Sequence, residues 1–238
     1  MKMRGVAVVI SVAAMAGACV PREQISFNAG PQQQTVIRDG QNTIVSRKKN
    51  STVMVRLASR DVARGQRPVF VLALQNGSKT PSDFRVSSVS AVQLQNGVAS
   101  RPIAVVPYEK LVSEERTRQV ISAVAVGLAA AGNNINAQNA SYNSYGRYSP
   151  IAGAINGARA DAQNAAMIQD AAASGQINMT ALEQNVLKDN TVMPNEWVGG
   201  QLHLEPPQSE NAGPKSYVIS VPVGDELHEI AVTQGSAG

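Results

Sequence analysis

The spacing of apolar residues divides the chain into two β-like parts separated by a helical part. Within residues 51–57 the apolar side chains occupy every second position, which is the period of a half-buried strand. The stretch 69–74 is apolar throughout, as expected of a central strand covered on both faces. Alternation returns at 217–223. These patterns predict strands within residues 35–107 and again within residues 199–238.

The intervening residues, 108–198, follow a helical period instead. A charged start leads into a nearly unbroken apolar run at 120–131, which predicts a long first helix. Pro150 stands where a second helix would begin, and Gly175 predicts its end. Residues 180–183 have the sequence of a capping box, which predicts a third, short helix.

The combination favours a mainly β fold with a helical insertion (β + α). Neither flank holds enough strands for a core of its own, since a lone two-stranded hairpin is marginal in water. We therefore expect one immunoglobulin-like β-sandwich, interrupted by an α-helical hairpin that leaves after Pro107 and returns near Gly199. Trp197, the only tryptophan, is expected to fill the core where the chain re-enters the sandwich.

The first twenty residues have a different layout. Lys2 and Arg4 form a basic start, residues 6–16 are almost all apolar, and three small residues precede Cys19. This is the arrangement of a secretory signal with its cleavage site. Because a cysteine follows the small residues, the stretch resembles a bacterial lipoprotein precursor, with Ala16 where leucine is commonest in that family.

The resemblance implies a signal peptide at 1–18 that is removed, and acyl chains attached to Cys19. Val20 follows the cysteine in place of aspartate, which in the family favours the outer membrane. Residues 19–34 are rich in Pro, Gln, Asn and Gly without periodicity, so we expect a flexible lipidated tether. Two alternatives stay open: secretion without lipidation, and an uncleaved anchor. The second is disfavoured because a span requires roughly 18 apolar residues.

Composition narrows the function. The formal net charge of +4 falls to +2 once Lys2 and Arg4 are removed, which is too small for a nucleic-acid-binding surface. A single cysteine excludes an intramolecular disulfide. His203 and His228 are the only histidines, and their spacing matches no metal-binding motif. Phosphate-binding loops and nucleophile elbows are absent from the sequence, so we expect no catalysis, no metal and no cofactor.

The helical insertion is the main candidate for contacts. Small residues recur every four positions in both helices, a pattern that lets helix backbones approach closely. Such faces suit a hairpin packed on itself or on the sandwich, or a surface for self-association or membrane insertion. Spanning a bilayer is disfavoured by the polar second helix and the short apolar run of the first. The small residues are Ala123, Gly127, Ala131, Gly153, Ala154, Gly157, Ala158, Ala162 and Ala166.

Tyr142, Tyr145 and Tyr148 lie in the Asn-rich connector between the helices. Tyrosines among small polar residues are typical of binding loops, and the alternative is a flexible tip. The sequence thus predicts a lipid-anchored, non-catalytic envelope protein of the outer membrane, on its periplasmic or surface face. We expect it to serve as an accessory subunit of a complex, with another envelope protein or a second copy as partner. A ligand- or glycan-binding lipoprotein and an uncharacterised hydrolase are the alternatives.

Overall fold

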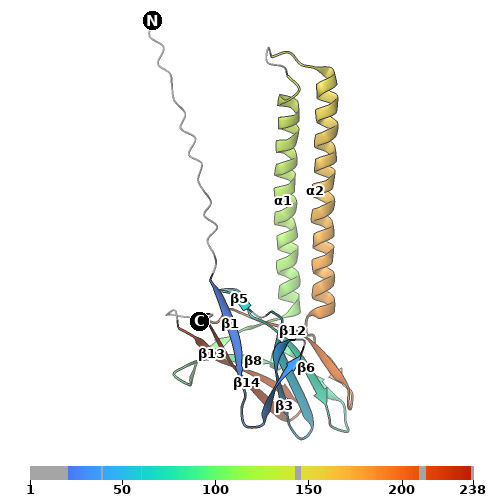
Figure 1. Ribbon diagram of the computed structural model, residues 1–238. Helices are drawn as coiled ribbons and strands as arrows, with labels where there is room; N and C mark the ends of the chain where they lie inside the picture. Colours follow the sequence, from blue (N-terminus) through green and yellow to red (C-terminus); the bar gives the residue numbers. More distant parts are fainter. Residues whose placement is uncertain (1–20, 39, 60, 143–145, 209–212, 237–238) are drawn as a thin grey trace, which may run out of the picture.

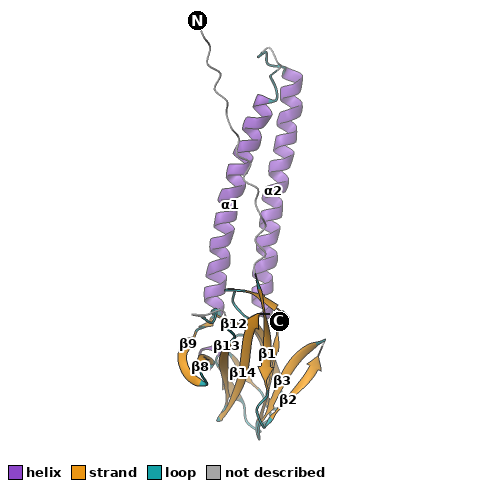
Figure 2. Ribbon diagram, turned by 60° about the vertical axis from the view of Figure 1, so that its left-hand side comes forward, coloured by secondary structure: helices purple, strands orange, loops and turns teal. Residues whose placement is uncertain are grey.

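The computed structural model describes residues 21–38, 40–59, 61–142, 146–208 and 213–236. The expected signal peptide, Cys19 and Tyr145 lie outside these residues. Figures 1 and 2 show a β-sandwich at one end of the molecule and two long antiparallel helices that extend from it. The expected fold, a β-sandwich interrupted by a helical hairpin, is confirmed.

Two six-stranded antiparallel sheets form the sandwich. In the first, the order is β5 (Asp61–Ala63), β1 (Arg22–Asn28), β14 (Glu226–Ser236), β13 (Lys215–Val223), β8 (Ser90–Gln95) and β9 (Val98–Ile103). In the second, the order is β10 (Val105–Val106), β12 (Trp197–Leu204), β6 (Val69–Asn76), β4 (Ser51–Leu57), β3 (Gln41–Arg47) and β2 (Gln33–Arg38). A short pair, β7 (Ser82–Phe84) with β11 (Asn190–Val192), lies beside them, and a 3₁₀ turn covers Val86–Ser88.

The core lies between the two large sheets. Val53, Val55 and Leu57 of β4 point inward, as their alternation predicts. In β6 only every second residue is fully buried. The outer face of this strand is therefore only half-covered, whereas the sequence predicted a strand covered on both faces. Phe70 of β6 meets Tyr217 of β13 across the layers, with ring centroids 6.4 Å apart. One continuous apolar cluster therefore joins both sheets.

The expected tether at 19–34 is wrong for its described part. Residues 22–28 form β1, which pairs with β14 on one side and β5 on the other. Glu23 and Ile25 face inward, so the strand alternates, but its first inward residue is charged. A buried carboxylate at a core position concealed the two-residue period. The sandwich begins at residue 22, not at 35.

The insertion also differs from its expected outline. It contains two helices, α1 (Tyr108–Asn139) and α2 (Pro150–Asn185), because α2 continues through both Gly175 and the expected capping box. Gly175 is buried against the side chain of Gln119, so it permits a close approach and does not end the helix. The sheet resumes earlier than expected, since β12 begins at Trp197.

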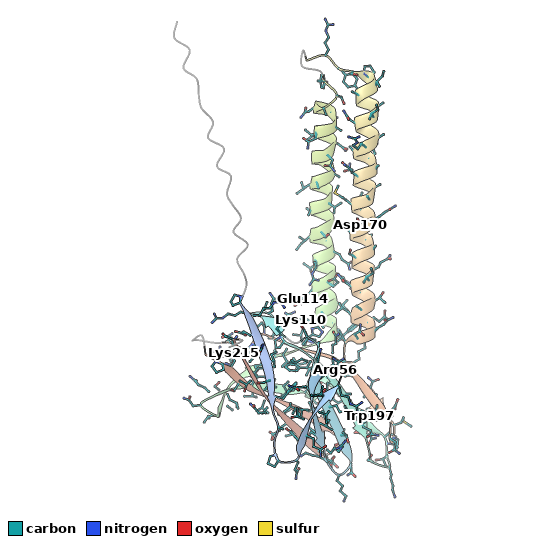
Figure 3. The ribbon with its side chains drawn as sticks, viewed as in Figure 1. Arg56, Lys110, Glu114, Asp170, Trp197 and Lys215 are labelled. Carbon is teal, nitrogen blue, oxygen red and sulfur yellow. The ribbon has the colours of Figure 1, made fainter. Side chains whose placement is uncertain are left out.

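Trp197 does not fill the core. Its side chain is 46% exposed and lines a groove on the outer face of the second sheet, beside Arg38, Arg56 and Thr43. Figure 3 shows Trp197 toward the end of the sandwich away from the helices. Leu187 instead occupies the core where the chain returns to the sandwich, and it is 2% exposed.

Candidate functional site: the helical hairpin and its root

A polar junction attaches the hairpin to the sandwich. Arg67, in the turn between β5 and β6, donates hydrogen bonds to both carboxylate oxygens of Glu114 on α1 and of Glu205 just past β12. Lys110 of α1 donates a further bond of 2.6 Å to Glu205. Figure 3 shows Lys110 and Glu114 at this root. Planar guanidinium geometry suits such paired contacts, so the junction fixes the direction in which α1 leaves the sheet.

Apolar contacts complete the root. Val106, Leu111 and Val186 form a small buried cluster, against which Tyr108 and Leu182 pack. Lys188 lies 4.5 Å from the centre of the Tyr108 ring. Both ends of the hairpin are therefore fixed to the sandwich where they enter and leave it.

We predict that the junction weakens in acid. Hydrogen bonds from Lys110 and Arg67 hold the pKa of Glu205 below its usual value. A carboxylate with a lowered folded-state pKa stabilises the protein above its unfolded-state pKa, and that contribution disappears as the pH falls through the folded-state value. Glu205→Gln should therefore cost about 1 kcal/mol at neutral pH and nothing in strong acid. Thermal unfolding of both proteins across pH checks this, and a pH-independent difference would contradict it.

The seam between the helices contains small and polar residues together with the half-buried Val126 and Met167. The half-buried positions of α1 on this seam include Gln119, Ser122 and Asn133. Asn133 donates to Asn164 of α2 at 3.0 Å, and Gln119 donates to the Gly175 carbonyl at 3.1 Å. Nearer the root, Asn178 donates to Glu115 at 3.1 Å. Side-chain hydrogen bonds thus join the two helices at three points along the hairpin.

The predicted small-residue faces do not form a close helix contact. A Cβ added at Gly127 or Gly157 would meet nothing within 4 Å, and Ala131 is exposed. Gly127 and Ala123 instead line a groove of about 380 Å³ between the helices. The close approaches occur at Gly175 and at Gly153, which lies against the Tyr148 side chain. The sequence pattern identified small residues without showing which of them face the partner helix.

Large apolar side chains lie on the outside of the hairpin. On α1 they are Val120, Ile121, Val124, Leu128 and Ile135, each between 58% and 72% exposed. On α2 they are Ile151, Ile155 and Ile177, between 57% and 75% exposed, while Ile168 lines the groove between the helices. This exposure could not be predicted from the sequence, because a helical period does not show which face of a helix meets the partner helix.

The tip of the hairpin brings two of the three predicted tyrosines together. Tyr142 and Tyr148 form a bridge, with ring centroids 5.5 Å apart and each ring more than half exposed. Ser149 caps α2 by accepting a hydrogen bond from the Ala152 amide. The tip thus presents a paired aromatic surface.

The histidines have structural surroundings. His228 is fully buried and contacts Ser51 at 2.8 Å and Ser46 at 2.9 Å. The Ser51 hydroxyl donates to Glu226, so its proton is directed away from the imidazole that would have to remove it. Burial lowers the pKa of His228, and it also lowers the pKa of His203 on β12. Neither histidine lies in a cluster of three potential metal ligands among the described residues.

Sequence reasoning missed the residues of the root. Arg67 lies between β5 and β6, and Glu205 follows β12, so neither belongs to a recognisable sequence motif. Their proximity depends on the topology that places β10 beside β12, and no local pattern encodes it. No protein-family model matches the chain, and comparison with curated proteins and with solved structures finds no match either.

Proposed function

We propose that this protein is a lipid-anchored assembly component of the bacterial cell envelope, held at the outer membrane through Cys19. The sandwich acts as a rigid base, and the helical hairpin makes the contacts by which a complex forms. The partner is another envelope protein or a second copy of this chain. The function is non-catalytic.

One observation carries the proposal: the hairpin exposes a row of large apolar side chains that nothing else in the described chain covers. Leu128 is 72% exposed and Ile151 is 75% exposed. Contiguous exposed apolar surface on a folded protein marks a site of interaction with a protein or a membrane. The buried His228 cluster offers no comparable access for a substrate, which favours assembly over hydrolysis.

A shortened hairpin provides the test. Gln119 contacts Gly175, so deletion of residues 120–173 with a short glycine-rich turn would join helix ends that already lie side by side. The root contacts of Arg67 and Glu115 are kept. In cells, chemical crosslinking of the full chain should give a discrete larger species, and the shortened chain should not form it. Crosslinks that persist unchanged would assign assembly to the sandwich.

The proposed lipid anchor requires a separate experiment, in which the membrane and soluble fractions are compared. The shortened chain with Cys19 intact should stay in the membrane fraction, because the acyl chains do not depend on the hairpin. The same chain with Cys19→Ala should move to the soluble fraction. Retention of both in the membrane would remove the lipid anchor from the proposal, whatever the crosslinking result. Circular dichroism of both chains checks that the sandwich is folded.

A further inference from the structure

The hairpin exposes large apolar side chains that a helix pair in water would normally bury. Its seam is hydrogen-bonded through Asn133, Asn164 and Gln119, while Leu128 and its neighbours point away from the partner helix. A helix pair in water buries its apolar face and exposes its polar one. In a bilayer the preference reverses, because small and polar residues hold helices together and apolar residues face the acyl chains.

The outer apolar stripe lies on α1. Val120, Val124, Leu128 and Ile135 occupy an arc of about 80° on the helix, opposite the residues that meet α2. By length and composition α1 is able to cross a membrane, and none of its apolar window is buried in the protein. A core helix of a soluble domain would pass the same test of composition, but it would be covered.

The positions of the charged residues also distinguish α1 from α2. In α1 all of them lie in the first part of the helix, between Glu109 and Arg118. From Gln119 to its end α1 carries none. The middle of α2 carries Arg159, Asp161 and Asp170, all of them exposed. Only α1 therefore presents an uncharged outer face of the kind that hydrocarbon accepts.

The start of the described chain lies at the root of the hairpin. The carbonyl of Pro21 accepts a hydrogen bond of 2.9 Å from the Arg64 amide, three residues before the junction residue Arg67. Figure 1 shows β1 beginning at the end of the sandwich from which α1 rises. Cys19 precedes Pro21 by two residues, which span at most about 7 Å when extended.

The proposed lipid anchor, on which this step rests, would therefore hold the membrane surface at the hairpin end of the sandwich. Thirty-two residues make α1 about 48 Å long. The bilayer is about 40–45 Å thick with its headgroups. A helix pair of this length, beginning beside the anchor, has the reach to cross the whole layer. Its tip carries Tyr142 and Tyr148, and aromatic residues of this type favour membrane interfaces.

We propose that the hairpin inserts into the lipid bilayer, with the outer stripe of α1 against the acyl chains. α2 is turned away from lipid, so that Asp161 and Asp170 face other copies of the hairpin or water between them. From the sequence, a span is disfavoured by the polar residues of α2 and the short apolar run of α1, which do not show which face of each helix is exposed. The described geometry gives the two helices different roles.

Fluorescence quenching by lipids brominated on their acyl chains tests this. The probe is Leu128→Trp in the full acylated chain with Trp197→Phe, reconstituted into phosphatidylcholine vesicles. Its emission should shift to the blue and be mostly lost with brominated lipid. Gln169→Trp in the same background is the matched control, since residue 169 lies on α2 at nearly the same height and should keep most of its emission. Trp197 of the unmodified chain should also stay unquenched.

Flotation of the vesicles distinguishes the proposed lipid anchor from the proposed insertion of the hairpin. Protein that floats while the tryptophan at 128 is unquenched would keep the anchor and overturn insertion, and the stripe would then be covered by protein. Equal quenching at 128 and 169 would overturn the assignment of α1 as the lipid-facing helix. Protein that fails to float at all would overturn the anchor and, with it, the orientation inferred here.

Discussion

Lys215→Met should lower the free energy of unfolding by about 3 kcal/mol, because it removes the hydrogen-bonded cation of a buried carboxylate and leaves only the more exposed Arg64, 3.7 Å away. Lys215 of β13 donates to both oxygens of Glu23 on β1, at 2.9 and 2.7 Å. Gln234, on the strand between them, donates to the same carboxylate at 2.7 Å, and Tyr217 donates to Gln234. Lys215 and Glu23 are only 6% and 5% exposed, so water cannot replace the lost partner.

The pH dependence of this variant follows from the state of Glu23. Burial alone would raise the pKa of Glu23, but the hydrogen bonds from Lys215 and Gln234 outweigh it and hold the pKa below its usual value. The wild-type pair therefore stabilises the protein at neutral pH, and that contribution is lost as the pH falls through the folded-state pKa. Without Lys215, burial favours the protonated acid, so the deficit of the variant should shrink in acid.

Urea unfolding at several pH values measures both effects. The double variant Glu23→Leu/Lys215→Met is the control, since replacing both partners of a buried ion pair by apolar residues is often neutral. It should recover most of the lost stability. If the double variant is as unstable as Lys215→Met, the cost comes from packing around the lysine stem and not from the unpaired charge.

Gly200→Ala should cost about 3 kcal/mol, at the upper end of overpacking effects, because the added methyl group would meet main chain and not flexible side chains. A Cβ at this position of β12 would lie 2.6 Å from the Leu187 amide nitrogen and 2.9 Å from the Asn185 carbonyl oxygen. The Leu187 amide donates to the Gln201 carbonyl, which fixes the chain where α2 ends. The methyl group must therefore displace the end of the hairpin.

Gly127→Ala is the matched control. Its Cβ would meet nothing within 4 Å, and alanine is about 1 kcal/mol better than glycine in a helix interior. We expect this variant to be slightly more stable than the wild type while Gly200→Ala is less stable. Thermal unfolding ranks the three proteins. A loss at Gly127 would instead indicate a tight helix contact at that residue.

Much of the fold could be predicted from alternation alone. The buried strand β4 and the last strands have apolar residues at every second position, and the two-residue period identifies such strands directly. β1 could not be found in this way. Its inward positions hold Glu23 and Ile25. The buried carboxylate of Glu23 is stabilised by Lys215, which is almost two hundred residues away in sequence. Long-range compensation of a buried charge leaves no local pattern.

The hairpin was predictable as a helical pair but not as a surface. Apolar residues in α1 extend nearly all around the helix, so composition could not say whether Gly127 or Leu128 faces α2. The Asn133 amide donates to Asn164 across the two helices, and Leu128 is exposed on another face of α1. The root was not predictable, since it depends on two strands and a turn that only the folded sandwich brings together.

The pairing of β1 with β14 has a consequence for the order of folding. The strand nearest the proposed lipid anchor lies between β14, near the far end of the sequence, and the three-residue β5. In the proposed export the anchored end would emerge first, yet the strand that pairs with β1, β14, is synthesised more than two hundred residues later. Contacts so distant in sequence form slowly. Under the proposed anchoring, β1 should therefore stay open to chaperones and proteases until β14 is synthesised, so that only chains carrying β14 close the sandwich.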